Sequence, residues 1–176
     1  MRLYEAFGLE PALSLDPEDL KKRFYDRSRQ WHPDRFSRAS ATEQEKALEM
    51  TSVLNDAFRT LRDPVSRAEY FLKENGIELS KEAPPELLEE VFELNMVLEE
   101  LRGGDESARP QLIEARAKFL AMREAIDREL AAAGARYDTS REKAVLDEIR
   151  AALNRRRYIR NLITMVEADV ENVLPN

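Results

Sequence analysis

The stretch Trp31-His32-Pro33-Asp34-Arg35-Phe36 decides how the first half of the chain folds. Proline has a fixed φ and no N–H group, so Pro33 cannot lie inside a helix, and it moves His32 out of the helical region as well. The six residues are therefore predicted to form a loop between two helices. The rings of Trp31 and Phe36 can be buried at its ends, which would leave His32 and Asp34 pointing outward from a fixed base.

His32 is the only histidine in the chain. A single histidine in a His-Pro turn is commonly a loop residue without a role. The other possibility, a general base, requires further catalytic groups. The sequence contains no cysteine, no Gly-rich phosphate loop and no nucleophile elbow. We therefore expect no catalytic residue and no enzyme activity.

The composition indicates a soluble, helix-rich protein of one large or two small domains, with 176 residues of which 36% are charged. The absence of cysteine excludes disulfides and Cys-ligated metals, and one histidine disfavours a His-based metal site. We expect no metal and no cofactor. No apolar run approaches the ~20 residues of a membrane span, and the first residues do not resemble a targeting peptide. A cytoplasmic location without a membrane partner is expected.

The first half of the chain predicts four helices. Residues 3–7 form a short helix, and Asp16 caps a second one that buries Leu20, Phe24 and Trp31. Thr42-Glu43-Gln44-Glu45 has the pattern of a capping box and opens an antiparallel third helix, whose Phe58 should meet Phe24. Asp63-Pro64 ends that helix, and a fourth covers about 65–74.

The second half predicts a three-helix bundle. Pro84-Pro85 indicates a domain boundary, which divides the chain into a first domain (1–76), a linker (77–84) and a bundle (85–176). The bundle helices are expected at about 85–102, at about 109–133, and from a capping box at Thr139 to Glu142 onward. The predicted fold class is all-α, with an antiparallel helical hairpin and short flanking helices followed by an antiparallel three-helix bundle.

Charge is unevenly distributed along the chain. Residues 21–38 carry seven basic and two acidic side chains, a net charge of +5, whereas residues 78–101 carry eight acidic and one basic, a net charge of −7. One molecule therefore offers a positive and a negative surface, which suggests two partners of different character.

The basic residues Lys21, Lys22 and Arg29, with Arg35 in the loop, allow three interpretations. They could bind nucleic acid phosphates, they could bind an acidic protein surface, or they could form a solvated face without a partner. Residues 1–76 contain 13 basic and 14 acidic side chains, and this balance argues against DNA or RNA. We expect no nucleic acid partner.

The helix expected at 85–102 has two apolar stripes. Leu87, Val91, Leu94, Leu98 and Leu101 cluster within about ±40° of one direction and form the core seam. Leu88, Phe92 and Met96 fall roughly 140° away. This second stripe is either a docking face for another protein or the wide core face of a helix buried on two sides. Tyr158 and Leu162 of the last helix could extend it.

The first 75 residues resemble a J-domain, the module by which co-chaperones stimulate ATP hydrolysis in DnaK-type chaperones. The resemblance rests on the short helix, the basic helix, the His32-Pro33-Asp34 loop and the closing motif Asp63-Pro64-Val65-Ser66-Arg67-Ala68-Glu69-Tyr70. With an acidic three-helix bundle after it, the whole chain resembles the HscB co-chaperones of iron–sulfur cluster biogenesis. Because no Cys-rich N-terminal extension of the animal type precedes the J-domain, a bacterial protein is expected.

The resemblance implies two sets of site residues. The chaperone, HscA in this family, would be bound by His32, Pro33, Asp34, Lys21, Lys22, Arg29 and Arg35. The iron–sulfur scaffold protein IscU would be bound by Leu88, Phe92, Glu93 and Tyr158, with Met96 from the stripe. Glu89 and Asn95 depart from a bacterial relative, which has methionine and arginine there. A J-domain co-chaperone that serves a different client is the alternative.

Overall fold

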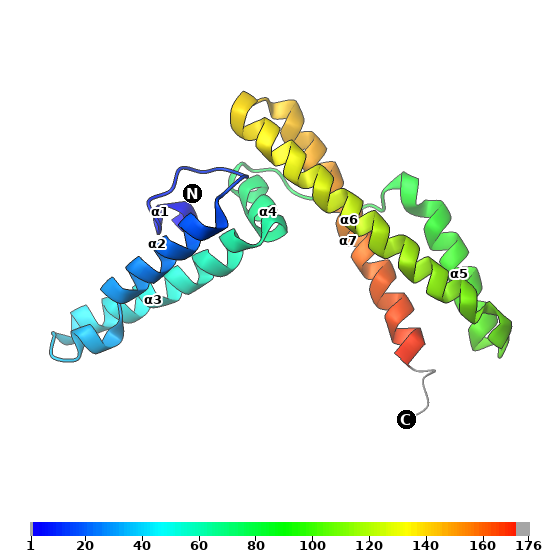
Figure 1. Ribbon diagram of the computed structural model, residues 1–176, viewed down its shortest axis with the longest axis horizontal. Helices are drawn as coiled ribbons and strands as arrows, with labels where there is room; N and C mark the ends of the chain where they lie inside the picture. The colour runs from blue at the N-terminus through cyan, green and yellow to red at the C-terminus, as the bar shows by residue number, and fades with distance from the viewer. Residues whose placement is uncertain (1, 172–176) are drawn as a thin grey trace. The chain divides into compact units, whose positions relative to one another are not determined.

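The computed structural model describes residues 2–171. Within that range all regular structure is helical and no strand occurs, which confirms the all-α expectation (Figure 1). None of these helices has an apolar stretch long enough to cross a bilayer. The elements are α1 (Arg2–Glu5), α2 (Pro17–Gln30), η1 (Pro33–Phe36), α3 (Ala41–Arg62), α4 (Pro64–Glu74), η2 (Pro85–Leu87), α5 (Leu88–Arg102), η3 (Glu106–Ala108), α6 (Arg109–Ser140) and α7 (Lys143–Glu171).

The chain divides into two compact units. The N-terminal unit comprises Met1–Ile77 and Gly134–Val145, and the C-terminal unit comprises Glu78–Ala133 and Leu146–Asn176. This division differs from the expected one at residues 134–145, which had been assigned to the bundle. The expected bundle range 85–176 also includes residues 172–176, which lie outside the described residues.

The starts of α2 and α3 are fixed by side-chain caps. Asp16 accepts a hydrogen bond from the Glu18 N–H at 2.9 Å, as expected for an N-cap. The capping box of α3 is formed by Ser40 and Glu43, and the expectation of a box at Thr42 to Glu45 was wrong. Ser40 and Glu43 have the required spacing of three residues, and so do Thr42 and Glu45. The helix begins at Ala41, so only Ser40 stands in the capping position.

The core of the N-terminal unit forms where α2 and α3 pack against each other. Phe24 and Phe58 stack with ring centroids 4.3 Å apart and planes 15° apart, which confirms the expected contact between the two helices. Leu20 is buried, whereas Phe24 and Trp31 are only half-buried. The other buried side chains of the helices in this unit include Tyr4, Ala47, Leu54, Ala57, Leu61, Phe71 and Leu72.

The hairpin between α6 and α7 is longer than expected. The prediction that α6 ends near residue 133 and that Thr139 to Glu142 caps the next helix was wrong, because α6 continues to Ser140. The chain reverses at Arg141, which has a positive φ of 57°, and α7 begins at Lys143. Gly134 is therefore a helical residue. A Cβ at this position would lie 3.2 Å from the Leu13 Cβ, so glycine here permits close packing of Leu13.

Arg67 and Asp138 hold the loop that precedes α2. The buried Arg67 guanidinium donates to the Leu13 carbonyl at 2.9 Å and to the Leu61 carbonyl at 2.6 Å. The Asp138 carboxylate accepts from the N–H groups of Leu13 and Ser14 at 2.9 and 2.6 Å. The buried carbonyls of Leu13 and Leu61 thereby gain hydrogen-bond donors. Burial lowers the pKa of Arg67 from its usual value.

Residues 78–84, here called the linker strap, are fixed to α7. Four side chains of α7 donate to four carbonyl groups of the strap. Arg150 donates to the Glu78 carbonyl at 2.7 Å, and the Tyr158 hydroxyl to the Lys81 carbonyl at 2.9 Å. The other two pairs are Arg157 with Ser80 and Asn154 with Glu82. The strap is thus an ordered part of the C-terminal unit.

The C-terminal unit buries one face of each of its helices. Leu94 and Leu98 of α5 are 2% and 1% exposed, as expected for the core seam. Leu162 of α7 is 4% exposed, so the expectation that it could extend the second stripe was wrong. It packs in the core together with Ile159 and Val166 of the same helix. The buried side chains of α6 and α7 include Leu112, Phe119, Ile126, Ile149, Leu153, Ile159 and Val166.

Replacing Arg67 by methionine should lower the free energy of unfolding by about 2–3 kcal/mol, because the buried carbonyls of Leu13 and Leu61 lose their donor. Arg59→Met is the matched control, since Arg59 is 77% exposed in a surface pair with Asp56 and such pairs contribute at most about 1 kcal/mol. Urea unfolding of the two variants measures the difference. Equal stabilities would contradict the structural role of Arg67.

Candidate functional site

The loop between α2 and α3 exposes His32 and Asp34. Their side chains are 59% and 91% exposed. Pro33 is the first residue of the 3-10 helix η1, which contains Asp34, so the six residues predicted to form a loop are helical from Pro33 to Phe36. The His32 Nδ1 accepts a hydrogen bond from the Asp34 N–H at 3.3 Å. A ring nitrogen that accepts carries no proton, so in this arrangement the imidazole has its proton on Nε2, which remains available to donate to another molecule.

The base of this loop is packed against α3 and closed by two stacked rings. Trp31 and Phe36 stack with centroids 5.8 Å apart and planes 7° apart, and the Lys46 ammonium lies 5.8 Å from the Trp31 ring centroid. The Thr51 hydroxyl of α3 donates to the Trp31 carbonyl at 3.2 Å. The two aromatic rings are half-buried rather than fully buried, yet they connect the two ends of the loop. The position of Asp34 is therefore set by packing.

The basic residues of α2 share one face. Lys21, Lys22 and Arg29 are all exposed, as is Arg35 in η1. The Arg35 guanidinium donates to the Arg29 carbonyl at 3.2 Å, so its charge lies at the C-terminal end of α2, where the helix dipole favours a cation. Arg29 and Arg35 therefore lie beside the loop, whereas Lys21 and Lys22 lie toward the N-terminal end of α2, on the same side of the helix as Arg29.

Tyr25 was not among the predicted site residues, although it belongs to this face. It is 54% exposed and lies four residues from both Lys21 and Arg29. The helical spacing of four predicts this placement from the sequence, since residues i and i+4 share a face. Its ring contacts Phe24, with centroids 5.7 Å apart.

The second stripe of α5 is exposed. Leu88, Phe92 and Met96, here called the apolar stripe, are 57%, 65% and 49% exposed. The alternative that this face is buried on two sides is therefore wrong, because the other helices of the C-terminal unit cover α5 only along its Leu94 and Leu98 side. Three large apolar side chains in a row on one exposed helix face are typical of a docking surface.

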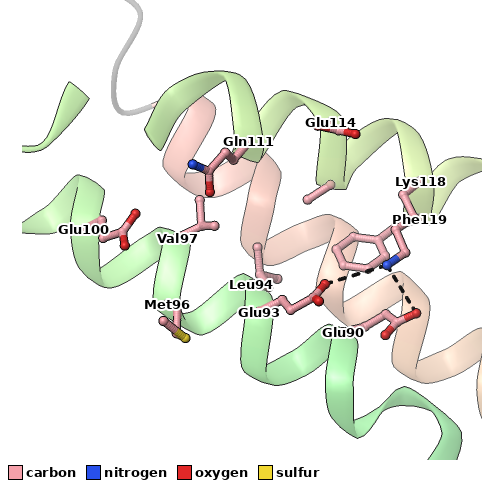
Figure 2. A pocket seen from close by; sticks show the side chains of 11 residues that line it. Glu90, Glu93, Leu94, Met96, Val97, Glu100, Gln111, Glu114, Lys118 and Phe119 are labelled. Carbon is pink, nitrogen blue, oxygen red and sulfur yellow. Dashed lines mark ion pairs between the residues drawn. The ribbon is translucent and has the colours of Figure 1, made fainter. Parts of the chain in front are cut away.

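Tyr158 has a different environment from the apolar stripe. It lies on α7 and is partly exposed, and its hydroxyl donates a hydrogen bond to the Lys81 carbonyl of the linker strap. The Arg157 guanidinium lies 5.6 Å from its ring centroid. Glu93 is exposed on α5 and points toward α6 (Figure 2).

Between α5 and α6 lies a cavity of about 460 Å³, here called the acidic groove (Figure 2). Its floor is apolar, and Lys118 pairs with Glu90 at 3.4 Å and with Glu93 at 3.8 Å. The α6 wall of the groove was not predicted from the sequence. Its polar residues Gln111, Glu114 and Lys118 recur at spacings of three and four, which places them on one face of the helix. The lining residues are Leu94, Val97, Ala115 and Phe119 on the floor and Glu90, Glu93, Met96, Glu100, Gln111, Glu114 and Lys118 around it.

Comparison with known families accounts for both halves of the chain. A family model of the DnaJ domain matches residues 2–70, and a family model described as the HSCB C-terminal oligomerisation domain matches residues 83–167. The chain belongs to the HscB family of J-domain co-chaperones. The match to the first model covers the exposed loop and the basic face, and the match to the second covers the apolar stripe and the acidic groove.

Relatives in the HscB family have similar sequences and folds. Co-chaperone protein HscB homologs of Neisseria meningitidis serogroup C and Vibrio vulnificus are 39% and 38% identical over 109 and 111 residues, which cover 58% and 61% of this chain. These alignments span 64% and 65% of the relatives' length, just under two thirds.

Two solved HscB structures match nearly the whole chain. The chaperone HscB from Vibrio cholerae has a TM-score of 0.68 at 29% identity and covers 99% of this chain and 100% of its own. The human co-chaperone protein HscB has a TM-score of 0.69 at 24% identity, with 97% and 82% coverage, and supports the fold alone.

Replacing Leu88 or Phe92 by alanine should change the free energy of unfolding by less than about 0.5 kcal/mol, because both side chains are exposed. Leu98→Ala on the core side of the same helix should cost about 2–5 kcal/mol. Thermal or urea unfolding of the three variants distinguishes a docking surface from a core face. A large loss of stability in Leu88→Ala would mean that this face is covered in solution.

Proposed function

We propose that this protein is a co-chaperone of iron–sulfur cluster biogenesis that stimulates ATP hydrolysis by the DnaK-type chaperone HscA and brings the scaffold protein IscU to it. The observation that carries the proposal is that one chain exposes two recognition surfaces of different chemistry. One is the basic face of α2 with the His32-Pro33-Asp34 loop, and the other is the apolar stripe on α5. In this role the protein needs neither a cofactor nor a catalytic residue of its own.

The basic surface is suited to an acidic face of the chaperone's ATPase domain. Lys21, Lys22 and Arg29 are exposed along α2, and complementary charge raises the rate of association and fixes orientation. The Asp34 side chain is 91% exposed and is available to pair with an arginine of the chaperone. His32 Nε2 can donate to the chaperone at the same time. Docking through this loop would be coupled to hydrolysis in the partner.

The apolar stripe is suited to the scaffold. Aromatic and large aliphatic side chains at the centre of an interface carry most of the binding energy, and Phe92 is the most exposed large apolar residue of the protein within the described residues. Glu93 supplies a flanking charge, and the Tyr158 ring lies on α7 of the same unit. The linker strap holds Tyr158 by its hydroxyl, which fixes the ring orientation.

Because both surfaces lie on one chain, the co-chaperone can bring the scaffold close to the chaperone. A scaffold bound to the apolar stripe is kept at a high effective concentration near the chaperone that the J-domain has engaged. Hydrolysis then occurs while the client is close. Each individual contact can remain weak, because the second binding step is intramolecular.

Asp34→Asn should abolish stimulation of the HscA ATPase and leave IscU binding unchanged. The substitution removes the carboxylate charge and keeps the side-chain volume. Steady-state phosphate release measures the first property, and calorimetric titration the second. Asp56→Asn is the matched control, since this carboxylate is exposed on α3 in a surface pair with Arg59. Full stimulation by Asp34→Asn would exclude the proposed role of the loop.

Phe92→Ala should weaken IscU binding by about 2 kcal/mol, roughly 30-fold, as expected for an aromatic anchor. Ile113→Ala is the matched control, because Ile113 is also exposed, at 58%, but lies on α6 outside the stripe. Calorimetric titration with purified IscU provides the measurement. If HscA is stimulated while the unaltered protein does not bind IscU, the chain is a J-domain co-chaperone for a different client.

A further inference from the structure

The acidic groove is continuous with the apolar stripe. Met96 belongs to both, and Glu93 lines the groove and flanks the stripe on α5. A partner segment that covers Phe92 and Met96 therefore reaches the edge of the groove. The α6 wall of the groove is not part of the scaffold-binding surface proposed above, which consists of the apolar stripe, Glu93 and Tyr158.

The charges of the groove are unbalanced. Four carboxylates line it, from Glu90, Glu93, Glu100 and Glu114, against the single ammonium of Lys118. Lys118 lies near Glu90 and Glu93, at 3.4 and 3.8 Å. Among the residues that the structure describes, no cationic group lies within ion-pair distance of Glu100 or Glu114. Figure 2 shows Glu100 at the end of the groove away from the Lys118 ammonium, whereas Glu114 lies on α6 about one helical turn from Lys118.

The floor of the groove is apolar. Leu94 and Phe119 are buried beneath it, and Val97 and Ala115 are half-buried. A long side chain with an aliphatic stem and a cationic head group matches this combination, since the stem packs on apolar surface while the charge stays near carboxylates and water. Arginine and lysine are the residues with this character. Among them, arginine can form two parallel hydrogen bonds with one carboxylate.

We infer that the acidic groove between α5 and α6 receives a lysine or arginine side chain of the scaffold protein, beside the segment that binds the apolar stripe. The inference rests on the proposed function, because the scaffold is the occupant. Glu114 of α6 and Glu100 of α5 would face the incoming cation. Lys118 competes with it, because both cations are attracted by Glu90 and Glu93.

The test is calorimetric titration of the full-length protein with purified IscU at low and at high salt. Glu114→Gln should weaken binding by about two- to fivefold at low salt, the range expected for one exposed ion pair, and the difference should shrink at high salt. Glu124→Gln is the matched control, because Glu124 is exposed on the same helix outside the groove. Lys118→Met should tighten binding by a similar factor, since a competing cation is removed.

The outcomes separate the two proposals. No binding of IscU to the unaltered protein would overturn the proposed function and the groove together. Binding by the unaltered protein, with Glu114→Gln equal to Glu124→Gln at both salt concentrations, would overturn the groove inference alone. Far-ultraviolet circular dichroism of each variant establishes that the helices are retained, so that a loss of affinity reflects the groove and not the fold.

Discussion

The buried guanidinium of Arg67 is the interaction on which the N-terminal unit depends most. A charged group is costly to bury without hydrogen-bond partners, and the Nε and Nη1 groups of Arg67 donate to the carbonyls of Leu13 and Leu61. It thereby joins the loop before α2 to the C-terminal end of α3. Asp138, from the tip of the α6–α7 hairpin, binds the same loop through two backbone N–H groups. Three segments that are distant in sequence thus meet at residues 13 and 14.

The arrangement explains why the hairpin tip belongs to the N-terminal unit. Tyr137 packs on Phe71 with ring centroids 5.5 Å apart, and Gly134 leaves space for Leu13. Within the same unit, the stacked rings of Phe24 and Phe58 stabilise the α2–α3 hairpin. The loop that carries Asp34 lies at the end of that hairpin, so helix packing and the stacked Trp31 and Phe36 rings set its geometry.

In the C-terminal unit, one-sided packing creates the candidate binding surface. The helices cover α5 along its Leu94 and Leu98 side and leave the apolar stripe exposed. Exposing three large apolar side chains gives up stabilisation of about 1.5–3 kcal/mol for each one that could have been fully buried. This is compatible with a surface that is covered by a partner. The linker strap adds a second element of order, because it satisfies donors of α7 with backbone carbonyls.

Much of this molecule could be predicted from its sequence, because the signals are local. Pro33 prevents α2 from continuing, Asp16 caps α2, and apolar periodicity defines the helices and the second stripe of α5. The tertiary structure alone decided what depends on distant neighbours: whether that stripe is exposed, that Leu162 is buried, that Ser40 and not Thr42 caps α3, and that α6 runs through Gly134 to Ser140. The acidic groove also required the fold, since its carboxylates come from two helices and no sequence pattern aligns them. Local geometry is encoded within a few residues, whereas exposure and charge clustering depend on which helix packs where.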